Sequence, residues 1–156
     1  MTVFLSGGAK NGKSSLAQEL AVRLAGDGPR YYVATMIPVD DEDRERIRRH
    51  VADRAGLGFE TVECGRDILS CLDRVDRGGS FLVDSATALL MNEMFRDGGI
   101  DEEAGDRCAR ELAEFVRSVE NAVVVSDNIY CDAGRYDEIT EGYRRGLAAL
   151  DRAAAR

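Results

Sequence analysis

The run Gly7-Gly8-Ala9-Lys10-Asn11-Gly12-Lys13-Ser14 constrains this chain more than any other part of its sequence. It matches the phosphate-binding loop pattern G-x-x-x-x-G-K-[ST], in which backbone N–H groups and a helix N-terminus converge on phosphate oxygens. An apolar run over residues 2–6 predicts a buried strand before the loop, and residues 15–25 predict a helix after it, with Leu16, Leu20 and Leu24 on one face. A chance match is the alternative, but the strand–loop–helix context favours phosphate binding.

Four residues of this run have distinct physical roles. Gly7 and Gly12 permit backbone angles that a Cβ atom disfavours. Lys13 places a cation beside the β- and γ-phosphates of a nucleotide, and Ser14 offers a hydroxyl oxygen to the Mg²⁺ that bridges them. The sequence therefore predicts a nucleoside triphosphate, with Mg²⁺ as its cofactor, at the turn between the first strand and the first helix.

Length and charge limit the classes of protein to which the chain can belong. Its 156 residues suffice for one domain covering 1–156. The net charge of −8, from 21 basic and 29 acidic residues, disfavours nucleic acid as the main partner. No segment approaches the roughly 20 apolar residues of a membrane span, and no signal peptide precedes the loop. The scattered Cys64, Cys71, Cys108 and Cys131 are typical of reduced thiols, so we expect a cytoplasmic protein.

Strand and helix signals alternate along the whole chain. After the first strand and helix, strand signals cover residues 30–35, 59–63, 80–84 and 122–126, and helix signals cover 40–55, 67–75, 86–95, 101–119 and 138–155. Such alternation predicts an α/β fold, a single P-loop NTPase-like domain with a mainly parallel sheet and helices on both faces.

A second chemical signal lies at the end of the apolar run 80–84. Asp84 follows Phe81-Leu82-Val83, and an acid in this position holds Mg²⁺ directly or through water in many phosphate-loop sites. Acids also end strands for solubility alone, so Asp84 is informative mainly in combination with the loop. The combination predicts that Ser14 and Asp84 act on one metal ion.

His50 is the only histidine, and it lies in a run of charged residues. In a helix, Arg46, His50 and Arg54 share one face because they are spaced four residues apart. A neutral imidazole is a nucleophile, and guanidinium groups bind phosphate oxygens. The residues alone nevertheless favour the simpler interpretation, a solvated histidine on a charged helix.

Four segments, taken in order, resemble one family. They are the glycine-rich loop, the strand Tyr32-Val33-Ala34-Thr35, the element Arg46-Ile47-Arg48-Arg49-His50 and the segment Glu60-Thr61-Val62-Glu63. They resemble the bifunctional adenosylcobinamide kinase / adenosylcobinamide-phosphate guanylyltransferase of cobalamin assembly. The Arg-Ile-x-x-His element is the most specific of them, because phosphate-loop kinases in general lack it. The resemblance is good as far as about Asn92 and weaker beyond it.

This resemblance implies a reaction in two steps. The enzyme would phosphorylate the aminopropanol hydroxyl of adenosylcobinamide, and His50 would then carry GMP from GTP to that phosphate as a covalent phosphoramidate. His50 and Lys13 would be the catalytic residues. The nucleotide would contact the loop residues 7–14 and a further set: Ala34, Thr35, Met36, Val51, Ala52, Asp53, Arg54, Glu63 and Asp84. The resemblance also implies a homotrimer with GTP or ATP and a corrinoid as its small-molecule partners.

The sequence differs from the family pattern in three places. Asp84-Ser85-Ala86-Thr87 replaces an acid followed by Cys and Thr, Asp127-Asn128-Ile129-Tyr130 replaces Asn-Glu-Val-Gly, and Arg156 stands where the family continues into a further apolar strand. An altered acceptor, a sheet completed by a partner subunit and reduced activity therefore stay open. So do two other functions, a P-loop kinase of small metabolites without a covalent GMP intermediate and a non-catalytic GTP-binding relative.

Overall fold

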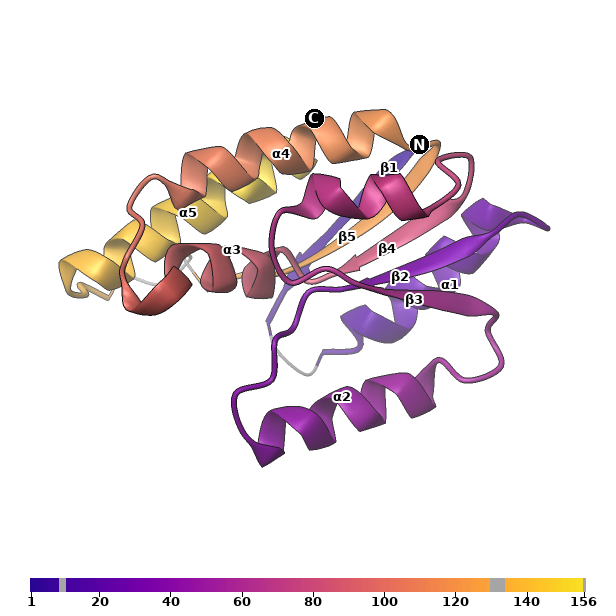
Figure 1. Ribbon diagram of the computed structural model, residues 1–156, viewed down its shortest axis with the longest axis horizontal. Helices are drawn as coiled ribbons and strands as arrows, with labels where there is room; N and C mark the ends of the chain where they lie inside the picture. The colour runs from indigo at the N-terminus through magenta and orange to yellow at the C-terminus, as the bar shows by residue number, and fades with distance from the viewer. Residues whose placement is uncertain (9–10, 130–133, 156) are drawn as a thin grey trace.

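The computed structural model describes residues 1–8, 11–129 and 134–155. Five strands form one parallel sheet in the order β1-β5-β4-β2-β3 (Figure 1). Their bounds are β1 (Thr2–Gly7), β2 (Arg30–Ala34), β3 (Phe59–Glu63), β4 (Ser80–Asp84) and β5 (Asn121–Asp127). The α/β class predicted from the alternating pattern is therefore confirmed.

Helices cover both faces of this sheet (Figure 1). They are α1 (Lys13–Ala25), α2 (Asp41–Asp53), α3 (Ala86–Met94), α4 (Ala104–Ser118) and α5 (Glu138–Ala154), with the 3₁₀ helices η1 (Ile68–Arg74) and η2 (Arg96–Gly98). Helix α1 packs on one face, and α3, α4 and α5 lie on the other. Helix α2 stands away from the sheet on the side of α1, and none of its residues is buried.

Alternation along the strands divides the apolar interior into two clusters. Phe81 and Val83 of β4 point to the face covered by α3, α4 and α5, where they pack with Phe115. Leu82 points to the opposite face and packs with Val123 of β5 against α1. Successive side chains of a strand point to opposite faces, so strands buried on both sides read as continuous apolar runs.

Helix α1 contacts the sheet through small side chains as well as through its leucines. Ala17 and Ala21 are fully buried, whereas Leu16 is 47% exposed, and Leu20 and Leu24 pack at the margin of the cluster. The predicted amphipathic helix is therefore present, but its innermost residues are the two alanines, each one position after a leucine. Small alanine side chains let the helix approach the sheet closely, and the leucine spacing alone does not reveal this.

The segment predicted as a helix over residues 67–75 is the 3₁₀ helix η1. Asp67 has a φ of 47°, in the left-handed region, so it cannot be the first residue of an α-helix. Its backbone N–H donates instead to Glu93 Oε1 at 2.7 Å. The bounds of the other elements differ from the predicted ones by three residues or fewer.

The cysteines that the structure describes are reduced, as the sequence predicts. Cys64, Cys71 and Cys108 are buried free thiols. Cys131 and Tyr130 lie outside the described residues. Within the described ranges, no helix combines the length and the apolar character needed to cross a membrane.

Two glycines set the close packing of α4 against α5. A Cβ atom on Gly105 would lie 2.6 Å from Gly146 Cα, which is backbone and cannot rotate away. A Cβ atom on Gly142, one turn earlier in α5, would first meet the flexible end of Met94 at 3.4 Å. The two helices therefore tolerate a methyl group at one glycine and not at the other.

We expect Gly105→Ala to lower the free energy of unfolding by about 1–3 kcal/mol, because the helices must move apart to accept the methyl group. The matched variant Gly142→Ala should be neutral or stabilise the protein by up to about 1 kcal/mol, because alanine favours the helix. Urea unfolding of both variants makes the comparison. Equal effects would contradict the close packing.

Candidate functional site

Most of the residues predicted to be functional gather at the carboxyl edge of the sheet. In the parallel register, Ala34 of β2 pairs with Glu63 of β3 and with Asp84 of β4. Gly7 of β1 pairs with Asp127 of β5 in the same way. The ends of the five strands therefore form one row, and in open α/β sheets this edge is where ligands bind.

The glycine-rich loop connects β1 to α1 at this edge. Gly12 has a φ of 85°, in the left-handed region that favours glycine, and α1 begins at the next residue. Ser14 lies half-buried in the first turn of α1, where backbone N–H groups have no acceptor within the helix. These groups are the ones that bind anions at helix N-termini. Ala9 and Lys10, also predicted to bind the nucleotide, lie outside the described residues.

Lys13 folds back over the loop that precedes it. Its Nζ donates to the carbonyl oxygens of Gly7 at 2.9 Å and Gly8 at 2.5 Å, and to Asn11 Oδ1 at 3.3 Å. It also forms an ion pair with Asp127 Oδ1 at 3.0 Å. Sequence reasoning did not select Asp127 as a site residue, although it ends an apolar strand just as Asp84 does.

Asp84, the last residue of β4, lies between the sheet and α2. Its Oδ2 accepts a hydrogen bond from the Tyr32 hydroxyl at 2.7 Å and lies 3.8 Å from His50 Nδ1. The His50 side chain is 31% exposed and the Asp84 side chain 13%. His50 therefore faces an acid of the sheet edge, and its ring is not on the fully solvated side of the helix.

Contacts of both its ring and its hydroxyl group hold the Tyr32 side chain in place. The Arg54 guanidinium lies 3.9 Å over the Tyr32 ring and donates to Thr61 Oγ1 at 2.9 Å. Burial, and then the negative charge of Asp84, raise the pKa of Tyr32 far above its usual range. The hydroxyl therefore stays protonated and acts as the donor to the carboxylate.

The remaining residues predicted to contact a nucleotide divide into two groups. Thr35 is buried beside Asp84, where its Oγ1 donates to the Ser85 carbonyl at 2.9 Å and accepts from the Ser85 N–H at 2.6 Å. The strand-end group is completed by half-buried Ala34 and Met36 and by exposed Glu63. A second group, exposed in the last turn of α2, consists of Val51, Ala52 and Asp53. The structure thus brings the first group to the row of strand ends and leaves the second on the helix.

Comparison with known families identifies the chain. The sequence profile of the family described as "Cobinamide kinase / cobinamide phosphate guanyltransferase" matches residues 3–156. The chain belongs to this family. No curated protein sequence matches it. The family is one of transferases with kinase and guanylyltransferase activity in cobalamin biosynthesis, so the resemblance found in the sequence is confirmed, and the profile also covers the part beyond Asn92 where that resemblance was weaker.

The oxygen groups at the strand ends fit the Mg²⁺ that a family of nucleotide-dependent transferases implies. In the part of the chain that the structure describes, no three His, Cys, Asp or Glu side chains cluster as a metal site. An ion at this edge would therefore have few protein ligands. Mg²⁺ bound with nucleotides has this character, since phosphates and water supply most of its oxygens. The Ser14 hydroxyl and Asp84 Oδ1, the carboxylate oxygen that Tyr32 does not occupy, are suitable donors.

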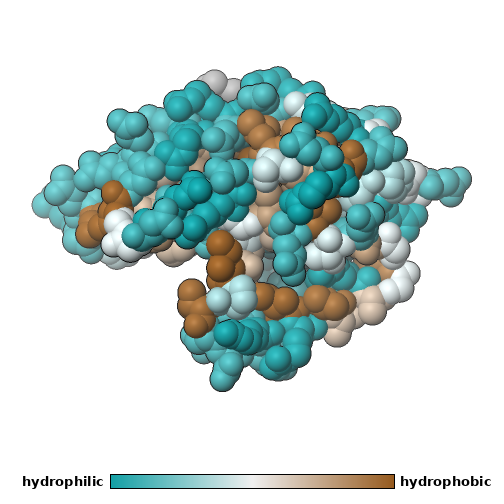
Figure 2. All heavy atoms as spheres, viewed as in Figure 1, coloured by the Kyte–Doolittle hydropathy of each residue, from teal (hydrophilic) through white to brown (hydrophobic). Residues whose placement is uncertain are grey.

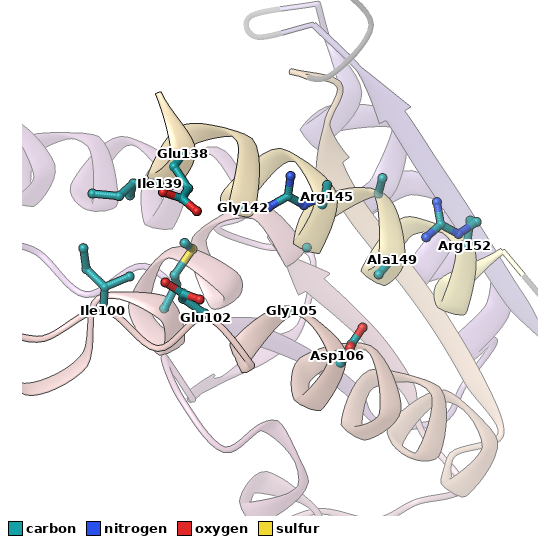
Figure 3. A pocket seen from close by; sticks show the side chains of 13 residues that line it. Ile100, Glu102, Gly105, Asp106, Glu138, Ile139, Gly142, Arg145, Ala149 and Arg152 are labelled. Carbon is teal, nitrogen blue, oxygen red and sulfur yellow. The ribbon is translucent and has the colours of Figure 1, made fainter. Parts of the chain in front are cut away.

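The surface is hollowed beside α2 (Figure 2), and a groove lies between α4 and α5. Figure 2 shows the surface hollowed between α2 and the end of the molecule formed by α3 and α5, and exposed Ile37 and Val39 belong to the segment that leads into α2. A separate groove of about 690 Å³ lies between α4 and α5 (Figure 3). Its lining includes the charged groups of Glu102, Asp106 and Arg145. None of the residues that line it lies at the strand ends, so the groove is distinct from the site there.

We expect Lys13→Met to weaken GTP binding by about tenfold or more, because a charge-assisted hydrogen bond to phosphate contributes roughly 1.5–3 kcal/mol. Arg23→Met removes a cation from the same helix, far along α1, where Arg23 pairs with Glu19 at 2.6 Å. This control should bind GTP as the native protein does. Titration with a fluorescent GTP analogue measures both affinities, and an equal loss in the two variants would contradict a phosphate role for Lys13.

Proposed function

We propose that this protein phosphorylates the aminopropanol hydroxyl of adenosylcobinamide with a nucleoside triphosphate and then transfers GMP from GTP to that phosphate through a guanylylated His50. One observation carries this proposal: the His50 ring lies 3.8 Å from Asp84, at the row of strand ends to which the glycine-rich loop also belongs. The only histidine of the chain thus lies at the same edge of the sheet as the loop, which supports a role for it toward a bound nucleotide.

Phosphoryl transfer to the acceptor hydroxyl requires alignment and neutralisation of charge more than covalent help. Lys13 and the N–H groups at the start of α1 would bind the β- and γ-phosphates. Ser14 and Asp84 would hold Mg²⁺, which adds positive charge at the phosphate oxygens when it is bound. Lys13 already lies among four oxygen atoms, and phosphate oxygens would take the place of some of them.

Guanylyl transfer requires a nucleophile that is also a leaving group, and imidazole has both properties. His50 Nε2 would attack the α-phosphorus of GTP, forming a P–N bond while the bond to pyrophosphate breaks. The phosphate of adenosylcobinamide phosphate would then attack the same phosphorus. The P–N bond breaks in that step, the product is adenosylcobinamide-GDP, and His50 returns to its starting state.

The proposal extends to the nucleotide contacts and to the assembly. The nucleotide would lie against residues 7–14 and the strand-end group Ala34, Thr35, Met36, Glu63 and Asp84, and α2 would add Val51, Ala52, Asp53 and Arg54. Following the resemblance noted in the sequence, we further propose that residues 1–156 act as one domain and that three copies assemble in the cytoplasm. Light scattering measures the mass of the assembly directly.

Incubation with GTP labelled at the α-phosphate should leave an acid-labile, alkali-stable label on the protein, because a phosphoramidate has this stability. His50→Asn should remove the label and leave transfer of the γ-phosphate to adenosylcobinamide largely unchanged. Arg49→Gln, which alters an exposed neighbour on α2, is the control and should label normally.

Absence of label on the native protein would exclude the covalent route. Kinase activity that persists without any label would instead favour a kinase of small metabolites. GTP that binds tightly but stays intact after long incubation with the corrinoid would favour a non-catalytic relative.

A further inference from the structure

One carboxylate oxygen faces both a tyrosine hydroxyl and the only histidine of the chain. Asp84 Oδ2 accepts from Tyr32 at 2.7 Å and lies 3.8 Å from His50 Nδ1. We propose that Tyr32 is a positioning residue for guanylylation: its hydroxyl fixes the Asp84 carboxylate so that Oδ2 orients the His50 ring. The inference rests on the proposed function of His50, and it assigns a role to a residue that the sequence analysis did not select.

Tyr32 is itself rigidly placed, so its hydroxyl can fix the Asp84 carboxylate. It lies on β2, between β3 and β4 in the sheet, and only 4% of it is exposed. Its ring is fixed by the Arg54 guanidinium at 3.9 Å and by an edge contact with Phe59 whose ring centroid is 6.3 Å away. The position of the hydroxyl is thus set mainly by the buried strand, and Arg54, which follows α2, packs over the ring.

The Asp84 carboxylate depends on such an anchor. Rotation about the last torsion of an aspartate is broad and nearly two-fold, so an unanchored carboxylate exchanges its two oxygens easily. The Tyr32 hydrogen bond selects Oδ2 for the side of His50. Oδ1 is then left for other ligands, which include the Mg²⁺ proposed above.

An oriented carboxylate determines which nitrogen of His50 is reactive. Nδ1 lies 3.8 Å from Oδ2, and once a small shift closes this gap to a hydrogen bond the proton of the neutral ring is favoured on Nδ1 and the lone pair is left on Nε2. When Nε2 bonds to the α-phosphorus and pyrophosphate leaves, positive charge develops on the ring. The Nδ1–H then faces a negative oxygen, which lowers the energy of the charged ring, as in other histidine–carboxylate pairs.

The two steps of the reaction should depend on this arrangement to different degrees. Guanylylation needs a reactive Nε2 on His50, whereas transfer of the γ-phosphate to a hydroxyl does not involve the ring. A residue that orients His50 should therefore affect guanylylation selectively. A residue that only stabilises the fold should affect both reactions together.

The test is Tyr32→Phe, which keeps the ring and its contact with Arg54 and removes the hydroxyl alone. Tyr31→Phe is the matched control, because Tyr31 is adjacent on β2, is 6% exposed and loses one hydrogen bond, from the Asp76 N–H at 3.0 Å. For both variants we would measure the single-turnover rate of labelling by α-labelled GTP at saturation, GTP affinity, γ-phosphate transfer and the melting temperature.

We expect Tyr32→Phe to slow labelling by about tenfold or more, as the loss of an orienting partner does in comparable sites. Its GTP affinity and its γ-phosphate transfer should fall far less, by about threefold at most, since neither uses the His50 ring and Asp84 would be only one of several oxygen ligands of the Mg²⁺. Tyr31→Phe should label at the native rate.

A second readout is independent of activity. Since His50 is the only histidine, ¹⁵N-histidine labelling gives ring signals from this residue alone. The native protein should show the tautomer protonated at Nδ1, and Tyr32→Phe should show a mixture of both tautomers.

Three results would overturn the inference. Native labelling rates and an unchanged tautomer in Tyr32→Phe would remove the role of the hydroxyl and leave the proposed function intact. Equal slowing of both reactions, with a lower melting temperature, would make Tyr32 a structural residue. A native protein that takes up no label would remove the proposed function, and the inference with it.

Discussion

Parallel pairing of the five strands is the constraint on which the site depends. Because all strands run in the same direction, their carboxyl ends meet at one edge, and the register places Gly7 beside Asp127 and Ala34 beside Asp84. No local feature of the chain brings these residues together, since β1 and β5 lie at opposite ends of the sequence. The loop that would hold phosphates and the acid that would hold Mg²⁺ are thus fixed relative to each other by the rigid core.

Helix α2 is attached to that core in a different way. None of the residues of α2 is buried, and its described links to the sheet are polar: His50 with Asp84, and Arg54, which follows the helix, with Tyr32 and Thr61. Contacts of this kind contribute about 0.5–2 kcal/mol each, far less than an apolar helix face. The helix is therefore free to shift at low cost, and the 3.8 Å separation from Asp84 is longer than a hydrogen bond, so a modest shift would close it.

The sequence predicted the parts of the fold that are encoded locally. Buried parallel strands appear as apolar runs, and the strands over residues 59–63 and 80–84 have the predicted bounds. The loop and Asp84 were found because each has a pattern at a fixed position. The sequence did not reveal that β5 lies between β1 and β4, and the pairing of Asp127 with Lys13 depends on that order.

Tyr32 was missed for a related reason. Tyr31 and Tyr32 are adjacent and both are buried, and only the direction of the pleat decides which of them faces α1 and the site. A shift of one residue in register would exchange the two. The leucine spacing of α1 likewise identifies an apolar face without showing that Ala17 and Ala21 are its innermost residues. Sequence patterns thus gave the residue types of the site, and the three-dimensional packing decided which neighbours complete it.

The two oxygens of Asp84 suggest how one site serves two reactions. In the proposed function, the groups that bind and neutralise phosphates belong to the sheet edge and α1, and they are sufficient for phosphoryl transfer. The proposed nucleophile for guanylyl transfer, His50, would come from a helix that is not part of the core. A shared acid links the two sets, with Oδ2 directed to Tyr32 and His50 and Oδ1 left for the metal. Because the link is polar and the helix is loosely attached, the proposed reaction would let the histidine approach or leave the phosphorus while the phosphate-binding groups stay in place.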